Sequence, residues 1–249
     1  MRGVIVFGLF AAPVAAVLLW PASPLAAIGI MALSHALVLY PTLRPNVQWL
    51  GPVVTRFQTA AREVWLTIDD GPADDTPALL DALDRHQAKA TFFVKGELAR
   101  ARPHLIREII RRGHGVGNHS HSHPSASFWC LPPAAIRREI GECNRALAEI
   151  TGSAPHYFRA PVGMKNPFVH PALGGLTLVG WTARAFDTTT EDPAVVLRRL
   201  LPDVEPGAIL VLHQGRASSA RIIDAVAGEL RNRGYALVLP DSGRLKTKR

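Results

Sequence analysis

The sequence predicts an α/β protein, in which parallel strands form a closed or nearly closed barrel with helices outside, preceded by a hydrophobic helical hairpin. Two observations predict this class. From residue 63 onward, short apolar runs alternate with amphipathic segments, which gives about seven β/α repeats in one domain of residues 63–240. Residues 3–43 contain no Asp, Glu, Lys or Arg, which is typical of membrane-spanning helices.

The N-terminal segment, residues 1–44, divides into two apolar runs. Gly3–Trp20 and Leu25–Tyr40 are separated by Pro21–Pro24, whose two prolines break a helix. About 20 apolar residues cross a bilayer, so each run is close to the length of one span. We therefore predict a membrane-anchoring hairpin of two helices, followed by a linker at residues 45–62.

The flanking charges predict an orientation for the hairpin. Arg2 and Arg44 stand at the outer ends of the two runs, and the turn between the runs carries no charge. The positive-inside rule then places both ends, and the domain after them, on the cytoplasmic side of the inner membrane. A single anchor or a cleaved signal peptide is the alternative, although no small-x-small cleavage site precedes the second run.

The predicted strands are short runs rich in apolar and β-branched residues. In chain order they are Val64–Ile68, Ala90–Val94, Val116–Asn118, Tyr157–Arg159, Leu176–Trp181, Ala208–Leu212 and Ala236–Leu239. Because helical segments separate these runs, the strands are expected to be parallel, with their C-terminal ends at one edge of the sheet.

Cap residues and apolar spacing predict the helices between the strands. Thr76-Pro77 is typical of a helix start, and Asp192-Pro193 starts another helix. Pro103–Arg112 carries its apolar residues on one side and is followed by glycine. Pro133–Ile150 is the longest helix, with its apolar residues in one stripe, and Ile222–Leu230 marks the last one. These helices would cover the outside of the barrel.

The chain is basic, with 28 Lys and Arg against 20 Asp and Glu and a formal net charge of +8. Four arginines and no acidic residue precede Glu63, so half of the excess borders the hydrophobic segment. The other basic residues are scattered over predicted helix faces, apart from a basic tail at residues 241–249. This distribution favours a membrane-proximal surface and argues against nucleic-acid binding.

Two cysteines, Cys130 and Cys143, are too few for a disulfide framework. Cys143 falls on the apolar stripe of the long helix, which predicts a buried free thiol. A single bridge between the two cysteines, which would imply an oxidising compartment, stays open at this point.

Carboxylate and imidazole side chains follow several of the predicted strands. Asp69 and Asp70 come directly after the first strand, His119 after the third, and His213 after an apolar strand. Adjacent carboxylates repel each other, and a cation relieves that repulsion. His119 and His123 are four residues apart and would share one side of a helical turn. An Asp with two His is a suitable ligand set for Zn²⁺, with one position left for water.

Each of these signals has a structural explanation when it is taken alone. An Asp pair before Gly-Pro is often a turn and a helix cap, and a His at a strand end is often a packing residue. His121 also leaves the register of the histidine pair open. Their joint occurrence at strand ends favours a metal-dependent enzyme, because the chemistry of such barrels collects at that edge.

Four segments match known motifs in order. Thr67–Pro72 is similar to TFDDGP, His119–His123 to H-[ST]-x-x-H, Arg159–Gly163 to R-x-P-x-G and Leu210–His213 to L-x-x-H. Over about residues 64–240 the sequence thus resembles the polysaccharide deacetylase family (the NodB homology domain, carbohydrate esterase family 4). The second motif settles the register of the histidine pair on its first and last residues.

A further motif departs from the family pattern. The family often has D-x-x-D-W after a tryptophan-bearing strand, whereas this chain has Arg184 for the first Asp and Thr188 for the final Trp. Asp187 remains in the place of the second Asp. The third motif carries Val162 where an aromatic residue is common, which weakens substrate stacking on that side.

The resemblance implies a distorted (β/α)7 barrel and a role for each matched residue. The implied ligands of a divalent metal, with Zn²⁺ as the expected ion, are Asp70, His119 and His123. The implied catalytic residues are Asp69 as general base, Arg159 as its partner, His213 as general acid and Asp187 as a candidate partner of that acid. The implied substrate-binding residues are Pro161, Val162, Trp181 and Leu210, and for Trp181 and Leu210 a plain core position is the alternative.

The activity implied by the resemblance is a metal-dependent hydrolysis that removes an N-acyl group, with acetyl as the first expectation, from an amino sugar of a polysaccharide, an oligosaccharide or a lipid-linked glycan. The membrane hairpin motivates the lipid-linked substrate. The alternatives are a deformylase of a lipid-linked amino sugar and a non-catalytic sugar-binding module on a deacetylase fold. Arg184 and Thr188 motivate the binding module.

Overall fold

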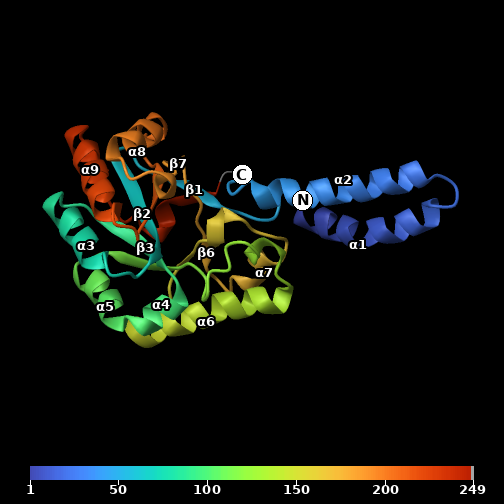
Figure 1. The fold of residues 1–249 in the computed structure, drawn as a ribbon, viewed down its shortest axis with the longest axis horizontal. Coiled ribbons are helices and arrows are strands. Elements are labelled where there is room, and N and C mark those ends of the chain that lie inside the picture. The colour runs from blue at the N-terminus through green and yellow to red at the C-terminus, as the bar shows by residue number, and fades with distance from the viewer. Residues whose placement is uncertain (248–249) are drawn as a thin grey trace.

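The computed structural model describes residues 1–247 and consists of a helical hairpin that projects from an α/β domain (Figure 1). Helix α1 covers Arg2–Leu19 and α2 covers Pro24–Leu43. The Ser23 side chain accepts a hydrogen bond from the Ala26 N–H, and Pro24 stands at the first helical position, so the sequence itself starts α2. Both outer ends of the hairpin lie at the domain, and its turn points away.

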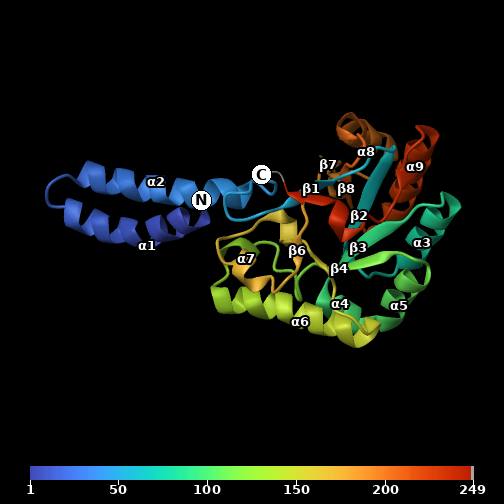
Figure 2. The same ribbon diagram turned by 180° about the vertical axis from the view of Figure 1, so that it is seen from behind.

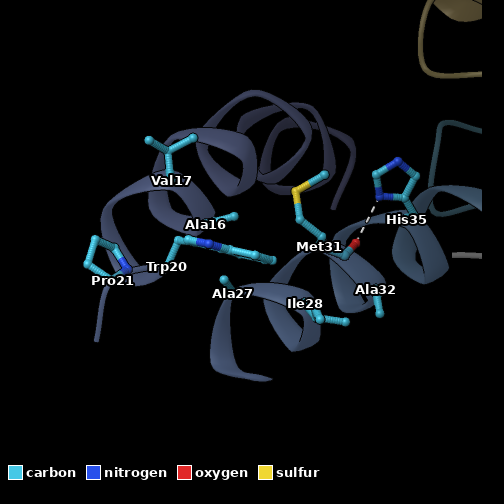
Figure 3. Close-up of a pocket in the computed structure, with 9 residues that line it drawn as sticks. All are labelled: Ala16, Val17, Trp20, Pro21, Ala27, Ile28, Met31, Ala32 and His35. Atoms are coloured by element: carbon cyan, nitrogen blue, oxygen red, sulfur yellow. Dashed lines mark hydrogen bonds between the residues drawn. The ribbon is translucent and has the colours of Figure 1, made fainter. Parts of the chain in front are cut away.

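Both helices are long and apolar enough to cross a membrane, and most of their surface is exposed. A cavity of about 590 Å³ lies between them near the turn, and Figure 3 draws the nine side chains that line it. Its only titratable lining residue is His35, whose Nδ1–H donates to the Met31 carbonyl at 2.8 Å. The hairpin cavity therefore offers an apolar surface without a group of reactive side chains.

The main sheet is a curled parallel sheet with the order β6-β5-β4-β3-β2-β8-β7, and β9 pairs with the start of β2. Its strands are β2 Glu63–Gly71, β3 Ala90–Val94, β4 Gly115–Asn118, β5 Tyr157–Phe158, β6 Thr177–Leu178, β7 Ala183–Arg184, β8 Ile209–His213 and β9 Ala236–Leu237. Strands β6 and β7 are consecutive in the chain but stand at opposite ends of this order, so the barrel is open between them.

The remaining helices pack around the sheet, as Figures 1 and 2 show from opposite sides. They are α3 Thr76–Arg85, α4 Gly96–Ala101, α5 Pro103–Arg111, α6 Pro133–Thr151, α7 Val169–Ala172, α8 Pro193–Leu200 and α9 Ser219–Asn232. Short 3-10 turns occur at Phe128–Cys130, Pro161–Gly163, Asp187–Thr189, Leu201–Asp203 and Ser242–Arg244. The largest apolar cluster joins the outward side chains of β2, β3 and β8 to α3, α5 and α9.

The predicted α/β class is confirmed, and the differences concern short elements. The predicted strand Leu176–Trp181 contains only the two residues of β6, because the Gly180 N–H donates to the Val54 carbonyl of β1 (Val54–Phe57) and not to β5. Helices α4 and α7 were not predicted, since segments of six and four residues carry too little periodicity. Cys143 is a buried free thiol, as predicted, and Cys130 is free and exposed.

The predicted linker 45–62 and basic tail 241–249 need correction. Strand β1, Val54–Phe57, pairs antiparallel with β10, Leu245–Thr247. The Val54 carbonyl also accepts from Gly180 N–H at 2.8 Å, and the Phe57 N–H donates to the Gly207 carbonyl at 3.0 Å, so β1 connects the segment after β6 with the segment before β8 across the open side of the sheet. Both segments are therefore part of the domain, because the open sheet edge offers backbone groups that they satisfy. Residues 248–249 of the predicted tail lie outside the described residues.

Candidate active site

A cavity of about 390 Å³ lies at the C-terminal edge of the curled sheet. Asp69 and Asp70 end β2, His119 follows β4, and His213 ends β8. The side chains that line the cavity are Asp69, Asp70, Lys95, His119, His123, Ser125, Val162, Gly163, Trp181, Arg184, Thr188, Val211 and His213. Residues that are up to 144 positions apart in the sequence thus meet where parallel strands end.

Three of the lining residues form a potential metal site. The ligand atoms of Asp70, His119 and His123 all lie within 4.8 Å of one another. The two Nε2 atoms are 3.2 Å apart, and they lie 3.9 and 3.5 Å from Asp70 Oδ1. Two ligands of a tetrahedral Zn²⁺ with bonds of about 2.0–2.1 Å lie about 3.3–3.4 Å apart. The three donors therefore fit a divalent ion of this type.

The protonation of the two histidines also suits a metal. His119 Nδ1–H donates to the Arg159 carbonyl at 2.8 Å, so its Nε2 carries the lone pair toward the cavity. Burial lowers the pKa of His119. Burial, together with the neighbouring His119, lowers the pKa of His123 to about 3. Both imidazoles are neutral at pH 7, as metal ligation requires.

The segment between the histidines is a loop and not the predicted helical turn. Ser120 and His123 have φ of 67° and 54°, which brings the second imidazole back toward the first. Ser120 Oγ accepts from the His123 N–H at 3.1 Å. Such backbone strain is typical of functional sites. The spacing of His119 and His123 in the sequence therefore indicated their proximity, but a strained loop brings the two rings together.

Sequence reasoning missed Glu139 of α6, which holds this loop. Its buried carboxylate accepts hydrogen bonds from the N–H groups of His121 and Ser122 at 3.0 and 2.9 Å, and from Ser122 Oγ at 2.7 Å. The available signal was an acidic residue next to Ile140 on the apolar stripe of a helix. A buried carboxylate needs donors, and the metal-site loop supplies them.

Lys95, at the end of β3, was also missed. Its Nζ lies 2.9 Å from Asp70 Oδ1. Burial alone would raise the pKa of Asp70, but His119, Lys95 and His123 outweigh it and lower the pKa to about 2. Asp70 is thus a carboxylate at all ordinary pH values. Its φ of 79° is in the left-handed region, which is uncommon for residues other than glycine.

Asp69 and Arg159 form a buried ion pair beside the metal site. Arg159 Nη1 donates to Asp69 Oδ1 and to Thr67 Oγ1, both at 2.7 Å, and its Nη2 donates to the Gly180 carbonyl at 2.8 Å. The guanidinium also lies over the Phe93 ring, 4.3 Å from its centroid. Oδ2 of Asp69 stays free of Arg159, so one carboxylate oxygen is available to accept a proton.

His213 is bound to Asp187, the acid that remains in the altered fourth motif. His213 Nδ1–H donates to Asp187 Oδ1 at 2.9 Å, and the His213 backbone N–H donates to Oδ2 at 2.7 Å. Burial opposes protonation of the imidazole. The Asp187 hydrogen bond and the charges of Asp69, Asp187 and Asp70 outweigh burial and raise the pKa of His213. Its Nε2–H is then available on the cavity side.

The predicted substrate-binding residues separate into two groups. Val162 and Trp181 line the cavity. Leu210 does not reach it, because it is fully buried in the core between the sheet and the helices. Side chains alternate along a strand, so Val211 shares the cavity face with His213. Pro161 is buried at the start of a 3-10 turn and shapes the loop without lining the cavity.

Comparison with known proteins identifies the family of this chain. Residues 57–178 match the family model for polysaccharide deacetylase. The chain is 37% identical to a chitooligosaccharide deacetylase of Sinorhizobium fredii over 166 residues, which cover 65% of this chain and 76% of the relative. It is 32% identical to the peptidoglycan-N-acetylglucosamine deacetylase PgdA of Listeria monocytogenes over 191 residues, 76% of this chain but only 40% of that protein.

Solved structures of carbohydrate esterase family 4 proteins are also similar to this chain. A family 4 carbohydrate esterase from Streptomyces lividans, in complex with acetate, is 29% identical with a TM-score of 0.67, covering 75% of this chain and 98% of that one. A family 4 pseudoenzyme from Bacillus anthracis is 27% identical with a TM-score of 0.67, covering 73% of this chain and 65% of that one. The chain therefore belongs to the polysaccharide deacetylase family, which confirms the resemblance inferred from the motifs.

Proposed function

We propose that this protein is a metal-dependent hydrolase that removes an N-acyl group, acetyl in the first instance, from an amino sugar of a glycan. The observation that carries the proposal is that three different groups of side chains surround one cavity. These are an Asp–His–His donor set, a carboxylate paired with an arginine, and an imidazole paired with a second carboxylate. Amide hydrolysis needs these three: an electrophile, a base and an acid.

Each catalytic group has a defined atom for its task. Asp69 accepts a proton from the attacking water at Oδ2, the oxygen that Arg159 leaves free. His213, protonated and held at Nδ1 by Asp187, donates the proton on Nε2 to the leaving nitrogen as the C–N bond breaks. Arg159 fixes the orientation of Asp69 and balances its charge throughout.

Asp70, His119 and His123 would hold the metal, and Zn²⁺ suits two imidazoles and one carboxylate. Such an ion supplies a Lewis acid for the amide carbonyl and lowers the pKa of the attacking water. Glu139 keeps the ligand loop in place, since its carboxylate binds two backbone N–H groups between the histidines.

We further propose that the substrate is a glycan at the membrane, with a lipid-linked amino sugar as the preferred form. The support is the packing of the hairpin end against the cavity wall. Lys165 is buried and its Nζ donates to three carbonyls at the end of α2, those of Pro41, Arg44 and Pro45. Asn46 Nδ2 donates to the carbonyl of Trp181, a cavity-lining residue, at 2.8 Å. The cavity is thus held at the base of the membrane hairpin.

The charges at the hairpin ends favour a cytoplasmic domain, through the positive-inside rule. A reporter fused to the C-terminus tests this orientation. A fluorescent protein that folds in the cytoplasm is expected to be active there, and a fused alkaline phosphatase is expected to be inactive. The reverse pair of results would contradict the assignment and would point to wall or surface glycans as substrates.

Variants of the site test the proposed reaction. On a panel of N-acetyl and N-formyl amino sugars, Asp69→Asn is expected to lower kcat about 10²–10⁴-fold and to keep its bound metal. His119→Ala is expected to lose both metal and turnover. The exposed carboxylate of Asp74 provides a matched control, and Asp74→Asn should retain both. Metal bound without release of acetate or formate from any substrate would favour a sugar-binding module instead.

The membrane part of the proposal has its own measurement. The full-length protein in proteoliposomes is expected to hydrolyse an amino sugar on a lipid carrier with at least tenfold higher kcat/KM than the same sugar free in solution. Equal kcat/KM values for the two forms would contradict a lipid-linked substrate but not the deacetylase activity.

A further inference from the structure

Three carboxylates at the active-site cavity each have a cationic or imidazole partner. Asp69 pairs with Arg159 at 2.7 Å and Asp70 pairs with Lys95 at 2.9 Å. Asp187 pairs with His213 at 2.9 Å. The anionic groups of the site are therefore balanced within the protein.

Arg184 has no such partner. It lies in β7 and lines the cavity, yet no carboxylate among residues 1–247 lies within ion-pair distance of its guanidinium. Its buried Nε also lacks a hydrogen-bond partner. A guanidinium has five N–H donors, and leaving them without acceptors in a partly buried site is costly. Arg184 is thus a cationic side chain at the cavity without a carboxylate partner among the described residues.

The guanidinium of Arg184 is nevertheless fixed in place. It lies over two aromatic rings, 5.3 Å from the centroid of Trp181 and 4.7 Å from that of Phe186. The backbone of Arg184 is paired with Val211 of β8, which also lines the cavity. Arg199 Nη1 donates to the Phe186 carbonyl and holds the loop that follows β7. The Arg184 side chain is therefore ordered before a ligand binds, so binding costs little side-chain conformational entropy.

We propose that Arg184 binds an anionic substituent of the substrate, either a phosphate or a carboxylate. The substituent is carried by the amino sugar whose amide is hydrolysed or by the sugar next to it. Both anions accept two parallel N–H bonds from a guanidinium. Thr188 also lines the cavity and offers a hydroxyl donor. This inference deepens the proposed deacetylase function and rests on it.

The specificity ratio between charged and neutral substrates tests the inference. The probes are chitotriose with N-acetyl groups as the neutral sugar, N-acetylglucosamine 1-phosphate and N-acetylmuramic acid. The measured quantity is kcat/KM for the better anionic probe divided by kcat/KM for the neutral probe. In the full-length protein, Arg184→Met is expected to lower this ratio about 10- to 100-fold, mainly through KM. Arg184→Lys should recover part of it, because a point charge lacks the bidentate geometry.

Arg198 is an exposed arginine on α8 and serves as the matched control. Arg198→Met removes the same charge and should leave the ratio within twofold of wild type. Preference for the phosphate over the muramic acid identifies a glycosyl phosphate as the source of the anion, and the opposite preference identifies a sugar acid. An Arg184→Met ratio equal to that of wild type overturns the inference.

A binding measurement separates this inference from the proposed function. In the Asp69→Asn background, calorimetric titration with N-acetylglucosamine 1-phosphate is expected to show binding that Arg184→Met weakens at least tenfold and that added salt also weakens. Binding that persists unchanged in Arg184→Met overturns the role of Arg184, whatever the turnover. Salt-sensitive binding lost in Arg184→Met supports that role even where no acyl group is released.

Discussion

Replacing Arg159 by methionine tests whether the buried ion pair organises the active site. Arg159 is 1% exposed and Asp69 is 3% exposed, so neither charge is solvated by bulk water. Methionine keeps an unbranched apolar stem but removes the guanidinium, with all of its N–H groups and its contact with the Phe93 ring. Asp69 is then left as a buried carboxylate without its counter-charge, and the carbonyls of Val179 and Gly180 lose their donors.

The size of the effect follows from these contacts. Removing one partner of a buried ion pair costs about 3–5 kcal/mol, and each buried acceptor left without a donor adds about 1 kcal/mol or more. We expect a loss of about 5 kcal/mol in the free energy of unfolding for Arg159→Met. In a domain of this size, 1 kcal/mol lowers Tm by about 2–4 °C, so the expected decrease is about 10–20 °C.

A double-mutant cycle isolates the pair from the other contacts. Asp69→Asn should also destabilise the domain, because Arg159 becomes a buried cation without a carboxylate. The double variant Asp69→Asn/Arg159→Met should be more stable than the sum of the single effects predicts, with a coupling of about 1–3 kcal/mol. The exposed Arg198→Met should change Tm by no more than about 2 °C.

The assay is thermal unfolding of the detergent-solubilised full-length protein, followed by near-UV circular dichroism, with metal removed by a chelator so that metal binding does not mask the effect. If Arg159→Met lowers Tm by less than about 3 °C, the reasoning is refuted. Strictly additive single effects would refute it as well, since they would mean that Arg159 and Asp69 do not share an interaction energy.

Three further predictions concern other parts of the chain. The pKa of His213 is raised and the proposed reaction needs its protonated form, so kcat/KM should persist above pH 6.5 and fall as pH rises through the His213 pKa. Asp187→Asn should move this fall in kcat/KM to lower pH, because it removes the carboxylate that raises the His213 pKa. Lys165→Met should speed hydrogen exchange about tenfold in the segment after α2. Maleimide should label Cys130 but not native Cys143, whose pKa burial raises to about 12.

The meeting of the candidate metal ligands and the candidate acid–base residues at one cavity could be predicted from the sequence, because strand ends and motif order coincide. Apolar runs define where β2, β4 and β8 end, and parallel strands bring those ends together. The side-chain parity of β8 was also available. His213 faces the cavity, so period-two alternation assigns Val211 to the same face and favours the core position for Leu210.

Other features depend on contacts that no local pattern contains. Glu139 is 18 residues from the backbone of His121 that it binds, and its helix stripe alone does not reveal the partner. Strand β1 finds its antiparallel partner β10 at the opposite end of the sequence. The loop from Ser120 to His123 is strained and not a helical turn, because its backbone N–H groups bind the Glu139 carboxylate and Ser120 Oγ and not helix carbonyls.

The glycine of the third motif lies between the end of the N-terminal helical hairpin and the cavity. Gly163 has φ of 73°, and a Cβ at this position would lie 2.3 Å from Trp181 Cη2 and 2.9 Å from Pro45 Cβ. Trp181 forms the cavity wall, and Pro45 directly follows the end of α2 with its carbonyl bound by Lys165. Hairpin end, loop and wall are therefore packed as one unit. Because these contacts are densely packed, a side chain added at Gly163 would displace Trp181 and Pro45, and so would disturb the cavity wall and the end of α2 together.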